Sequence, residues 1–316
     1  MLLSVVLCTH RLDSYQNVID AVESLLRQTY HDMEIIVVVD GNHRLSEEIA
    51  QVYQGREKVR ILATGDKIGV CGARNAGIGV AQGEVVAFTD DDVVADSRWI
   101  ESLVDTYQTH DAVAVGGKIL PIWTATEPSH FPAELGWLVG ITHNGFAEEE
   151  VSEVRNAFGP NMSYRSEVFE KIGLFNERFG LGARGAVQLQ GEEAELALRM
   201  KRVLGRSVTY NPQAVVYHKV PPWKTTSRWM LRRAFYQGYS KALLRRSIPG
   251  HDTLSVEQAY LRRLLFKYAP SRTKRLLLRS DRAGELRKLG ILAASVVSAS
   301  LGFLCGFARK TPHGSA

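Results

Sequence analysis

Cysteine is scarce in this chain, and the few that occur are scattered. Cys8, Cys71 and Cys305 form no Cys-x-x-Cys pair among the 316 residues. This argues against a secreted disulfide scaffold and a zinc-cysteine site, and it suits a reducing compartment. No basic, cleavable leader precedes the first apolar run, residues 2–8, so no signal peptide is expected. Internal repeats are lacking, and 45% hydrophobic residues is typical of a globular protein.

Acidic residues are rare in the C-terminal third. Residues 219–316 contain 20 lysines and arginines but only 4 aspartates and glutamates, a net charge of +16, whereas the whole chain carries +5. Basic segments of this kind bind phosphates, either on nucleic acid or on anionic lipid. Residues 289–308 carry no charge and are just long enough to cross a hydrocarbon core of roughly 30 Å. We therefore expect a membrane partner with an anionic lipid surface, and no nucleic acid.

This distribution predicts three parts. Residues 1–218 form an α/β domain, residues 219–288 form a basic amphipathic helical region at a membrane surface, and residues 289–308 form a transmembrane or membrane-inserted helix. The alternative is a soluble helical subdomain in which residues 289–308 are a buried helix. Gly302 and Gly306 form a Gly-x-x-x-Gly pair, which can also pack two membrane helices.

Short apolar runs alternate with helical segments over the first 218 residues. Residues 35–39 are continuously apolar and β-branched, as expected of a buried parallel strand. Val18, Val22 and Leu25 recur at helical spacing before it, after Asp13 as a plausible N-cap. This alternation predicts an open, mostly parallel α/β sheet with helices on both faces. The expected strands are residues 2–8, 35–39, 59–63, 85–89 and 112–116, and the expected helices lie near 13–28, 45–53, 72–82, 97–109 and 191–204.

Polar residues follow the predicted strands, where a ligand binds in such a sheet. Thr9 follows the first strand, Asp40 the second, and Asp90, Asp91 and Asp92 the fourth. Alternate side chains of an extended chain point the same way, so Asp90 and Asp92 can face one ligand while Asp91 points elsewhere. Mg²⁺ or Mn²⁺ with a diphosphate would relieve the repulsion among three carboxylates; the alternative is a solvated acidic turn. Asp40 suits either the imide N–H of a base such as uracil or the cap of the next helix.

Three further features allow a functional and a structural interpretation each. The glycine-rich segment 69–77 is neither a P-loop nor a Gly-x-Gly-x-x-Gly fingerprint, which counts against a dehydrogenase. Arg74 within it can reach a phosphate or be a surface arginine. The carboxylates of residues 191–196 either complement a helix dipole or supply a general base. His218 ends an apolar run and is either structural or a metal ligand.

Taken in order, these motifs resemble those of family-two glycosyltransferases with the nucleotide-binding GT-A fold, over about the first 220 residues. The resemblance rests on Ser4-Val-Val-Leu-Cys-Thr9, Val38-Val-Asp-Gly-Asn42, Gly72-Ala-Arg-Asn-Ala-Gly77, Phe88-Thr-Asp-Asp-Asp92, Phe158-Gly-Pro-Asn-Met-Ser-Tyr-Arg165, Gly173-Leu-Phe-Asn-Glu177, Gly191-Glu-Glu-Ala-Glu-Leu196 and His218. Residues 38–42, 112–118, 136–143 and 232–241 are similar to those of archaeal enzymes that add glucuronic acid to glucosyl-dolichyl phosphate.

The resemblance implies a role for each of these residues. The nucleotide of a nucleotide-sugar donor would be bound by Thr9, Asp40, Arg74, Asp90 and Asp91. Asp92 and His218 would hold Mn²⁺ or Mg²⁺, which neutralises the leaving diphosphate. Glu193 would take the proton of the acceptor hydroxyl in an inverting transfer. One departure from the family pattern is Lys67, where an Asn is common.

A second departure concerns the base, because the family usually has Asp at the position of Glu193. The longer side chain leaves Glu192 and Glu195 open as alternatives. We expect a UDP-hexose or UDP-hexuronate donor and a lipid-linked dolichyl or polyprenyl phosphate glycan as acceptor. The basic flank before residue 289 predicts a cell-membrane protein whose active site faces the cytoplasm.

The acceptor pocket is expected in the loops of residues 119–157, where Trp123, Trp137 and His143 either contact the acceptor or simply pack. A rival hypothesis is a non-catalytic, membrane-attached nucleotide- or glycan-binding protein with the same fold. Another alternative is a family-two transferase that acts on a different cell-surface polysaccharide. The sequence does not indicate the oligomeric state.

Overall fold

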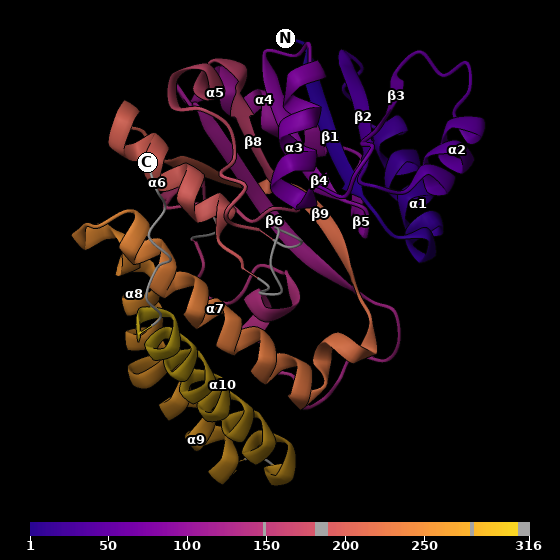
Figure 1. The fold of residues 1–316 in the computed structure, drawn as a ribbon. Helices are drawn as coiled ribbons and strands as arrows, with labels where there is room; N and C mark the ends of the chain where they lie inside the picture. Colours follow the sequence, from indigo (N-terminus) through magenta and orange to yellow (C-terminus); the bar gives the residue numbers. More distant parts are fainter. Residues whose placement is uncertain (148–149, 181–188, 279–280, 309–316) are drawn as a thin grey trace. The chain divides into compact units, whose positions relative to one another are not determined.

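The computed structural model describes residues 1–147, 150–180, 189–278 and 281–308. The chain divides into two compact units (Figure 1). The first unit comprises Met1–Ile122, Ala147–Gln188 and Glu192–Lys219, and the second comprises Trp123–Phe146, Leu189–Gly191 and Val220–Ala316.

The first unit is built on one mixed sheet. Its strands are β1 (Leu3–Thr9), β2 (Met33–Val39), β3 (Val59–Ala63), β4 (Val85–Asp90), β5 (Val93–Ala95), β6 (Ala114–Trp123), β7 (Ser152–Val154), β8 (Met162–Arg165) and β9 (Val208–Val220). Their order is β3-β2-β1-β4-β8-β6-β9-β5, with β7 also paired to β9. The first four strands in this order are parallel, whereas β8 is antiparallel to β4, and β5 is antiparallel to β9. The predicted α/β class is therefore confirmed, with its parallel part in β1 to β4.

Helices cover both faces of this sheet. In β2, each residue from Ile35 to Val39 is fully buried, and successive side chains of a strand point to opposite faces. On one face, Val6, Val38 and Phe88 pack against residues of the third, fifth and sixth helices. The helical elements are η1 (Leu12–Ser14), α1 (Tyr15–Leu26), α2 (His43–Val52), α3 (Gly69–Val80), α4 (Trp99–Thr109), α5 (Ser166–Ile172) and α6 (Glu192–Leu204).

One local detail corrects a prediction, the N-cap of α1, and another explains a glycine in the segment of residues 69–77. Asp13 does not cap α1; it pairs with Arg11, and Ser14 is the N-cap residue. Gly77 lies where α3 crosses β1, and a Cβ there would be 2.4 Å from Cγ1 of Val6. The glycine-rich segment therefore includes a residue that lets helix and strand backbones approach closely.

The second unit is helical. Its elements are η2 (Ala133–Val139), η3 (Pro222–Thr225), α7 (Ser227–Ser247), η4 (His251–Leu254), α8 (Ser255–Arg263), the π-helix η5 (Leu264–Tyr268), α9 (Ala269–Leu278) and α10 (Arg282–Ala308). Helices α7 and α10 pack side by side (Figure 1). Among the described residues, α10 is the one helix long and apolar enough to cross a membrane, judged by length and composition only, with a mean hydropathy of 2.0 over its apolar window.

A buried ion cluster joins η2, α9 and α10 within the second unit. The guanidinium of Arg272 contacts both carboxylate oxygens of Glu134, and its Nη1 lies 3.0 Å from Oε2 of Glu285. Tyr260 of α8 donates to the carbonyl oxygen of Glu134 at 3.0 Å. These contacts hold Trp123–Phe146 with the C-terminal helices, whereas the sequence placed these residues in the domain of residues 1–218.

Candidate active site

The carboxyl ends of β1, β2 and β4 lie side by side, because these strands pair in parallel register. Thr9, Asp40 and Asp90 are therefore neighbours at one edge of the sheet, as predicted for a ligand site in this class. His218 lies on β9, where it pairs with Val93 of β5, just after the three aspartates. The fold thus brings residues from four separate segments to this region of the first unit.

Asp90 and Asp91 point to different elements. Nη2 of Arg74 in α3 lies 3.4 Å from Oδ1 of Asp90, and the hydroxyl of Thr9 donates to Oδ2 of Asp91 at 2.6 Å. Burial, together with the charge of Asp92, raises the pKa of Asp91 to about 7. Burial also raises the pKa of Asp90, against the opposing effect of Arg74. Because Thr9 is only 3% exposed and its hydroxyl is already bonded to Asp91, the role of this hydroxyl is to position Asp91.

Asp92 and His218 form the pair predicted to hold a metal. Nε2 of His218 lies 3.2 Å from Oδ1 of Asp92, and the backbone N–H of Lys219 donates to the carbonyl oxygen of Asp92 at 2.8 Å. Within the residues that the structure describes, no group of three or more histidine, cysteine and acidic side chains could hold a metal ion. The pair still fits Mg²⁺ or Mn²⁺, since such ions are usually bound by one or two carboxylates, with phosphate oxygens and water completing the coordination. That Asp90 and Asp92 share one ligand stays a prediction.

Asp40 caps a helix. Its Oδ1 accepts from the Thr64 hydroxyl at 3.0 Å and from the Ile68 N–H at 2.8 Å, and its Oδ2 accepts from the Gly69 N–H at 2.9 Å. The helix that Asp40 caps is α3, whereas the next helix in the chain, α2, is capped by Asn42, so the predicted cap was placed on the wrong helix. A carboxylate offers about four acceptor sites, so these bonds leave room for one further donor such as a base imide.

Arg74 is a buried counter-charge. It is 3% exposed, with Nη1 3.1 Å from Oε1 of Glu192 and its guanidinium 5.6 Å from the ring centre of Phe175. Burial alone would lower its pKa, but the carboxylates of Glu192 and Asp90 raise it, so Arg74 stays charged. The surface-arginine alternative is therefore wrong, and the charge of Arg74 compensates two carboxylates at the site.

The three glutamates at the start of α6 have different partners. Glu192 is paired with Arg74, as described above. Glu195 forms two hydrogen bonds with Arg199, at 3.1 Å and 2.9 Å. Among the residues that the structure describes, Glu193 instead accepts one hydrogen bond, at 3.1 Å, from the backbone N–H of Gly159. Glu192 and Glu195 are thus held as carboxylates by arginines, which favours Glu193 among the three candidates for a general base.

The environment of Glu193 suits proton transfer near neutral pH. Its side chain is partly buried, and burial, with the negative charge of Glu192, raises its pKa to about 7. A general base is most effective when its pKa lies near the working pH. Adding a Cβ at Gly159 would place it 2.9 Å from Oε1 of Glu193 and 2.6 Å from Nη2 of Arg74, so a side chain there would displace both charged groups.

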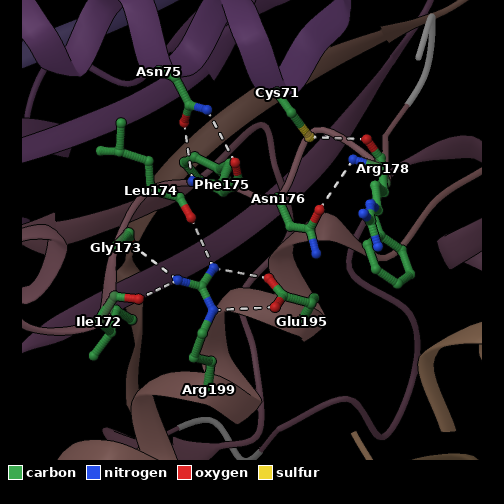
Figure 2. Close-up of polar contacts among 11 residues, drawn as sticks. Cys71, Asn75, Ile172, Gly173, Leu174, Phe175, Asn176, Arg178, Glu195 and Arg199 are labelled. Carbon is green, nitrogen blue, oxygen red and sulfur yellow. Dashed lines mark hydrogen bonds and ion pairs between the residues drawn. The ribbon is translucent and has the colours of Figure 1, made fainter. Parts of the chain in front are cut away.

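A loop of residues 172–179 ties α3 and α6 together (Figure 2). Asn75 of α3 donates to the Phe175 carbonyl and accepts from the Phe175 N–H, both at 2.9 Å. Arg199 of α6 donates to three successive carbonyl oxygens of this loop, those of Ile172, Gly173 and Leu174. Because Arg199 also holds Glu195, this loop fixes the first turns of α6, which carry Glu193.

The aromatic candidates for the acceptor pocket lie in the second unit. Trp137 and His143 pack on Tyr260, with ring centres 6.3 Å and 5.4 Å apart, and burial lowers the pKa of His143 to about 4. These contacts support the packing interpretation for both. Trp123 packs on Phe131 and also lines a cavity of about 280 Å³.

One residue whose role the sequence did not indicate is Asn161. It is fully buried, accepts from Nε1 of Trp99 at 2.9 Å, and donates to the carbonyl oxygens of Ala214 and Lys118 at 2.8 Å and 3.1 Å. Asn161 therefore joins β6 and β9 near the strand end that carries His218. The sequence feature that could have pointed to Asn161 is the Phe158-Gly-Pro-Asn161 motif. Such a motif does not distinguish a structural asparagine from one that binds a ligand.

The comparisons with known proteins agree with this geometry. The family model described as glycosyl transferase family 2 matches residues 4–173. The glucosyl-dolichyl phosphate glucuronosyltransferase of Haloferax volcanii is 36% identical over 314 residues, which cover 99% of this chain and 98% of the relative.

Two solved structures share the fold. The mannosyltransferase PcManGT from Pyrobaculum calidifontis, in complex with GDP-Man and Mn²⁺, aligns with a TM-score of 0.58 at 16% identity, covering 97% of this chain and 85% of that one. S. aureus TarS 1-349, in complex with UDP-GlcNAc, aligns with a TM-score of 0.54 at 14% identity, covering 97% and 89%. At these identities the likeness is one of fold, and it confirms the predicted GT-A class.

Proposed function

The chain belongs to glycosyl transferase family 2, and from this premise we propose that it transfers a sugar from a nucleotide-sugar to a lipid-linked glycan acceptor, with inversion at the anomeric carbon. The proposed donor is a UDP-hexose or UDP-hexuronate, and the proposed acceptor is a glycan on dolichyl or polyprenyl phosphate. The hexuronate and the dolichyl phosphate are suggested by the name of the Haloferax relative, which matches nearly the whole chain.

One observation carries the catalytic part of this proposal. Of the three glutamates in the first turn of α6, two are bound by arginines, and Glu193 accepts a hydrogen bond from a backbone N–H and has a pKa raised to about 7. A protein that only bound a nucleotide would not need such a group. We assign Glu193 as the general base that removes the proton from the attacking acceptor hydroxyl.

The donor would be held at the strand ends. Asp40 has acceptor capacity for the imide of a uracil base, and Asp90 lies at the end of β4, on the other side of β1, where a ribose would be bound. Thr9 and Asp91 act as a hydrogen-bonded pair beside them. Arg74 contributes by neutralising Asp90 and Glu192, which lowers the repulsion that an incoming diphosphate meets.

Asp92 and His218 are the residues that would hold a divalent cation, Mn²⁺ or Mg²⁺. Bound there, the cation would supply charge neutralisation for the departing nucleoside diphosphate. His218 lies on β9, and Asp92 lies in the turn just before β5, so the antiparallel pairing of β5 with β9 holds the two residues close together.

We further propose that the protein acts at the cell membrane with its first unit in the cytoplasm, where nucleotide sugars are made. Support comes from the net charge of +16 over residues 219–316 and from the apolar helix α10.

The test is product analysis with the full chain in lipid vesicles. It would be incubated with Mn²⁺, glucosyl-dolichyl phosphate and, in turn, UDP-glucuronate, UDP-glucose, GDP-mannose and dTDP-glucose, and the lipid products identified by mass spectrometry. We expect one UDP-sugar to be transferred and Glu193→Gln to abolish the product. If nucleotide-sugars bind but none is hydrolysed or transferred, the protein is a binding protein and the proposal fails.

A further inference from the structure

Helix α10 is packed unusually closely against α7. The hydroxyl of Ser298 donates to the carbonyl oxygen of Leu231 at 2.8 Å, and one and two helical turns further along, Gly302 meets Phe235 and Gly306 meets Tyr239. The contacting residue numbers increase by four along both α10 and α7, so the two helices run in the same direction. A Cβ at Gly302 would lie 1.9 Å from the carbonyl oxygen of Phe235. The Gly-x-x-x-Gly pair of α10 is therefore used inside the chain.

This packing excludes α10 as a lone transmembrane helix. The stretch of α7 that runs along it, from Leu231 to Ala242, contains Arg232, Arg233 and Lys241. If α10 crossed the bilayer in this arrangement, these charges would have to enter the hydrocarbon core with it, which is costly for each of them. A helix that lies flat, with α7 on its water side, avoids that cost.

The face of α10 that points away from α7 is apolar and exposed. Val297 and Leu304 are 58% and 63% exposed. The residues at helical spacing along this outer stripe are Leu286, Ala293, Val297, Leu301, Leu304 and Phe307. The buried residues Leu292, Ser295, Gly302 and Gly306 form the opposite face. α10 therefore has one face for protein and one long face without a partner in the chain described.

The charge of the residues around this stripe indicates which partner covers it. The surrounding unit is strongly basic, and Arg282 and Arg287 at the start of α10 are both exposed. An apolar stripe flanked by cations is the pattern of a helix in the interface of an anionic membrane. A second copy of the chain would instead bring an equally basic unit against the first, which is unfavourable.

We propose that α10 lies in the plane of an anionic membrane, with its outer stripe among the acyl chains and both of its ends on the same side of the bilayer. This deepens the membrane part of the proposed function and rests on it, but it does not require that the protein transfer a sugar. The mode of attachment is monotopic, with α7 bridging between α10 and water.

The first test compares two matched variants of the full chain. Val297 in α10 and Val203 in α6 are the same residue with nearly equal exposure, 58% and 57%. Binding to vesicles of phosphatidylglycerol and phosphatidylcholine, without nucleotide-sugar, is measured by flotation. Val297→Glu is expected to weaken binding on the order of 10-fold, and Val203→Glu to leave it unchanged. Leu304→Glu serves as a second variant of the stripe.

Equal binding by Val297→Glu, Leu304→Glu and the native chain would overturn the proposal. So would a native chain that self-associates in lipid-free solution through this stripe, with both stripe variants monomeric, since the occupant would then be a second copy. Nucleotide-sugar hydrolysis by the same variants in detergent should be unchanged, which separates failure of the membrane proposal from failure of the transferase proposal.

The second test places the C-terminus. A cysteine is added after Ala316 in a Cys305→Ser background, and the chain is bound to sealed vesicles from outside. A membrane-impermeant maleimide should label the added cysteine fully before the vesicles are lysed. Labelling only after lysis would show that α10 crosses the bilayer and would overturn the in-plane arrangement.

Discussion

Replacing Glu193 by Gln should separate catalysis from binding and from stability. The amide keeps the size of the side chain and can still accept the Gly159 N–H through its oxygen, but it cannot take a proton. Transfer is expected to fall at least about 100-fold, the usual effect of removing a general base. Donor affinity should stay nearly the same, because the nucleotide residues lie at the strand ends.

The same substitution should stabilise the protein above neutral pH. In the folded state the pKa of Glu193 is raised from 4.5 to about 7, so ionising it costs free energy that the unfolded chain does not incur. The stability due to this group is thus present below about pH 4.5 and is lost as the pH rises through 7. At roughly 1.4 kcal/mol per unit, the loss is at most about 3 kcal/mol, and Gln removes it.

The substitution is expected to lower turnover but to raise the free energy of unfolding above neutral pH, and the assay tests both effects. Turnover, donor binding by calorimetry and urea unfolding at pH 5 and pH 8 are each measured for the native chain and for Glu193→Gln. The control is Glu192→Gln, which takes a counter-charge from the buried Arg74 and should destabilise the protein. The reasoning is refuted if Glu193→Gln retains turnover, or if it loses stability at pH 8 as Glu192→Gln does.

Other expectations concern the pH profile, the metal pair, the ion cluster and the cavity. The kcat/KM of the native chain should fall as the pH drops below about 7, because Glu193 then becomes protonated, and a profile flat to pH 5 would exclude it as the base. Asp92→Ala, or a chelator, should lower kcat/KM by about 100-fold or more, measured with and without excess Mn²⁺. Arg272→Met should lower the free energy of unfolding by roughly 3 kcal/mol or more, because two buried carboxylates lose their partner, and acidic pH should restore part of it. If the cavity lined by Trp123 holds the acceptor, Trp123→Ala should raise the KM for the acceptor and leave the KM for the donor unchanged. Equal increases in the two KM values would count against an acceptor site in this cavity.

Much of the first unit could be predicted because its signals are local. The strand at residues 59–63 was predicted with its observed bounds, and residues 35–39 are fully buried in β2, as their continuous apolar run predicted. The strand-end residues Thr9, Asp40 and Asp90 meet as expected, because parallel strands place their carboxyl ends together.

The partners of these residues could not be predicted, because they are distant in sequence. Arg74 and Glu192 are 118 positions apart and meet only after the sheet has formed. The position of Asp40 favoured a base and a helix cap equally, and only the fold shows that it caps α3. In the same way, the Gly302 and Gly306 spacing indicated close packing but not which helix fills it.

The buried ion cluster of the second unit also sets an order of events during synthesis. Glu134 is made 138 residues before Arg272, and Glu285 follows 13 residues later. The first unit ends at Lys219, so its core can assemble while the ribosome is still making the C-terminal helices. Residues 123–146 cannot, because Glu134 has no buried counter-charge until α9 emerges. The nascent chain therefore completes the sheet of its first unit first and exposes the outer stripe of α10 only in its last stage.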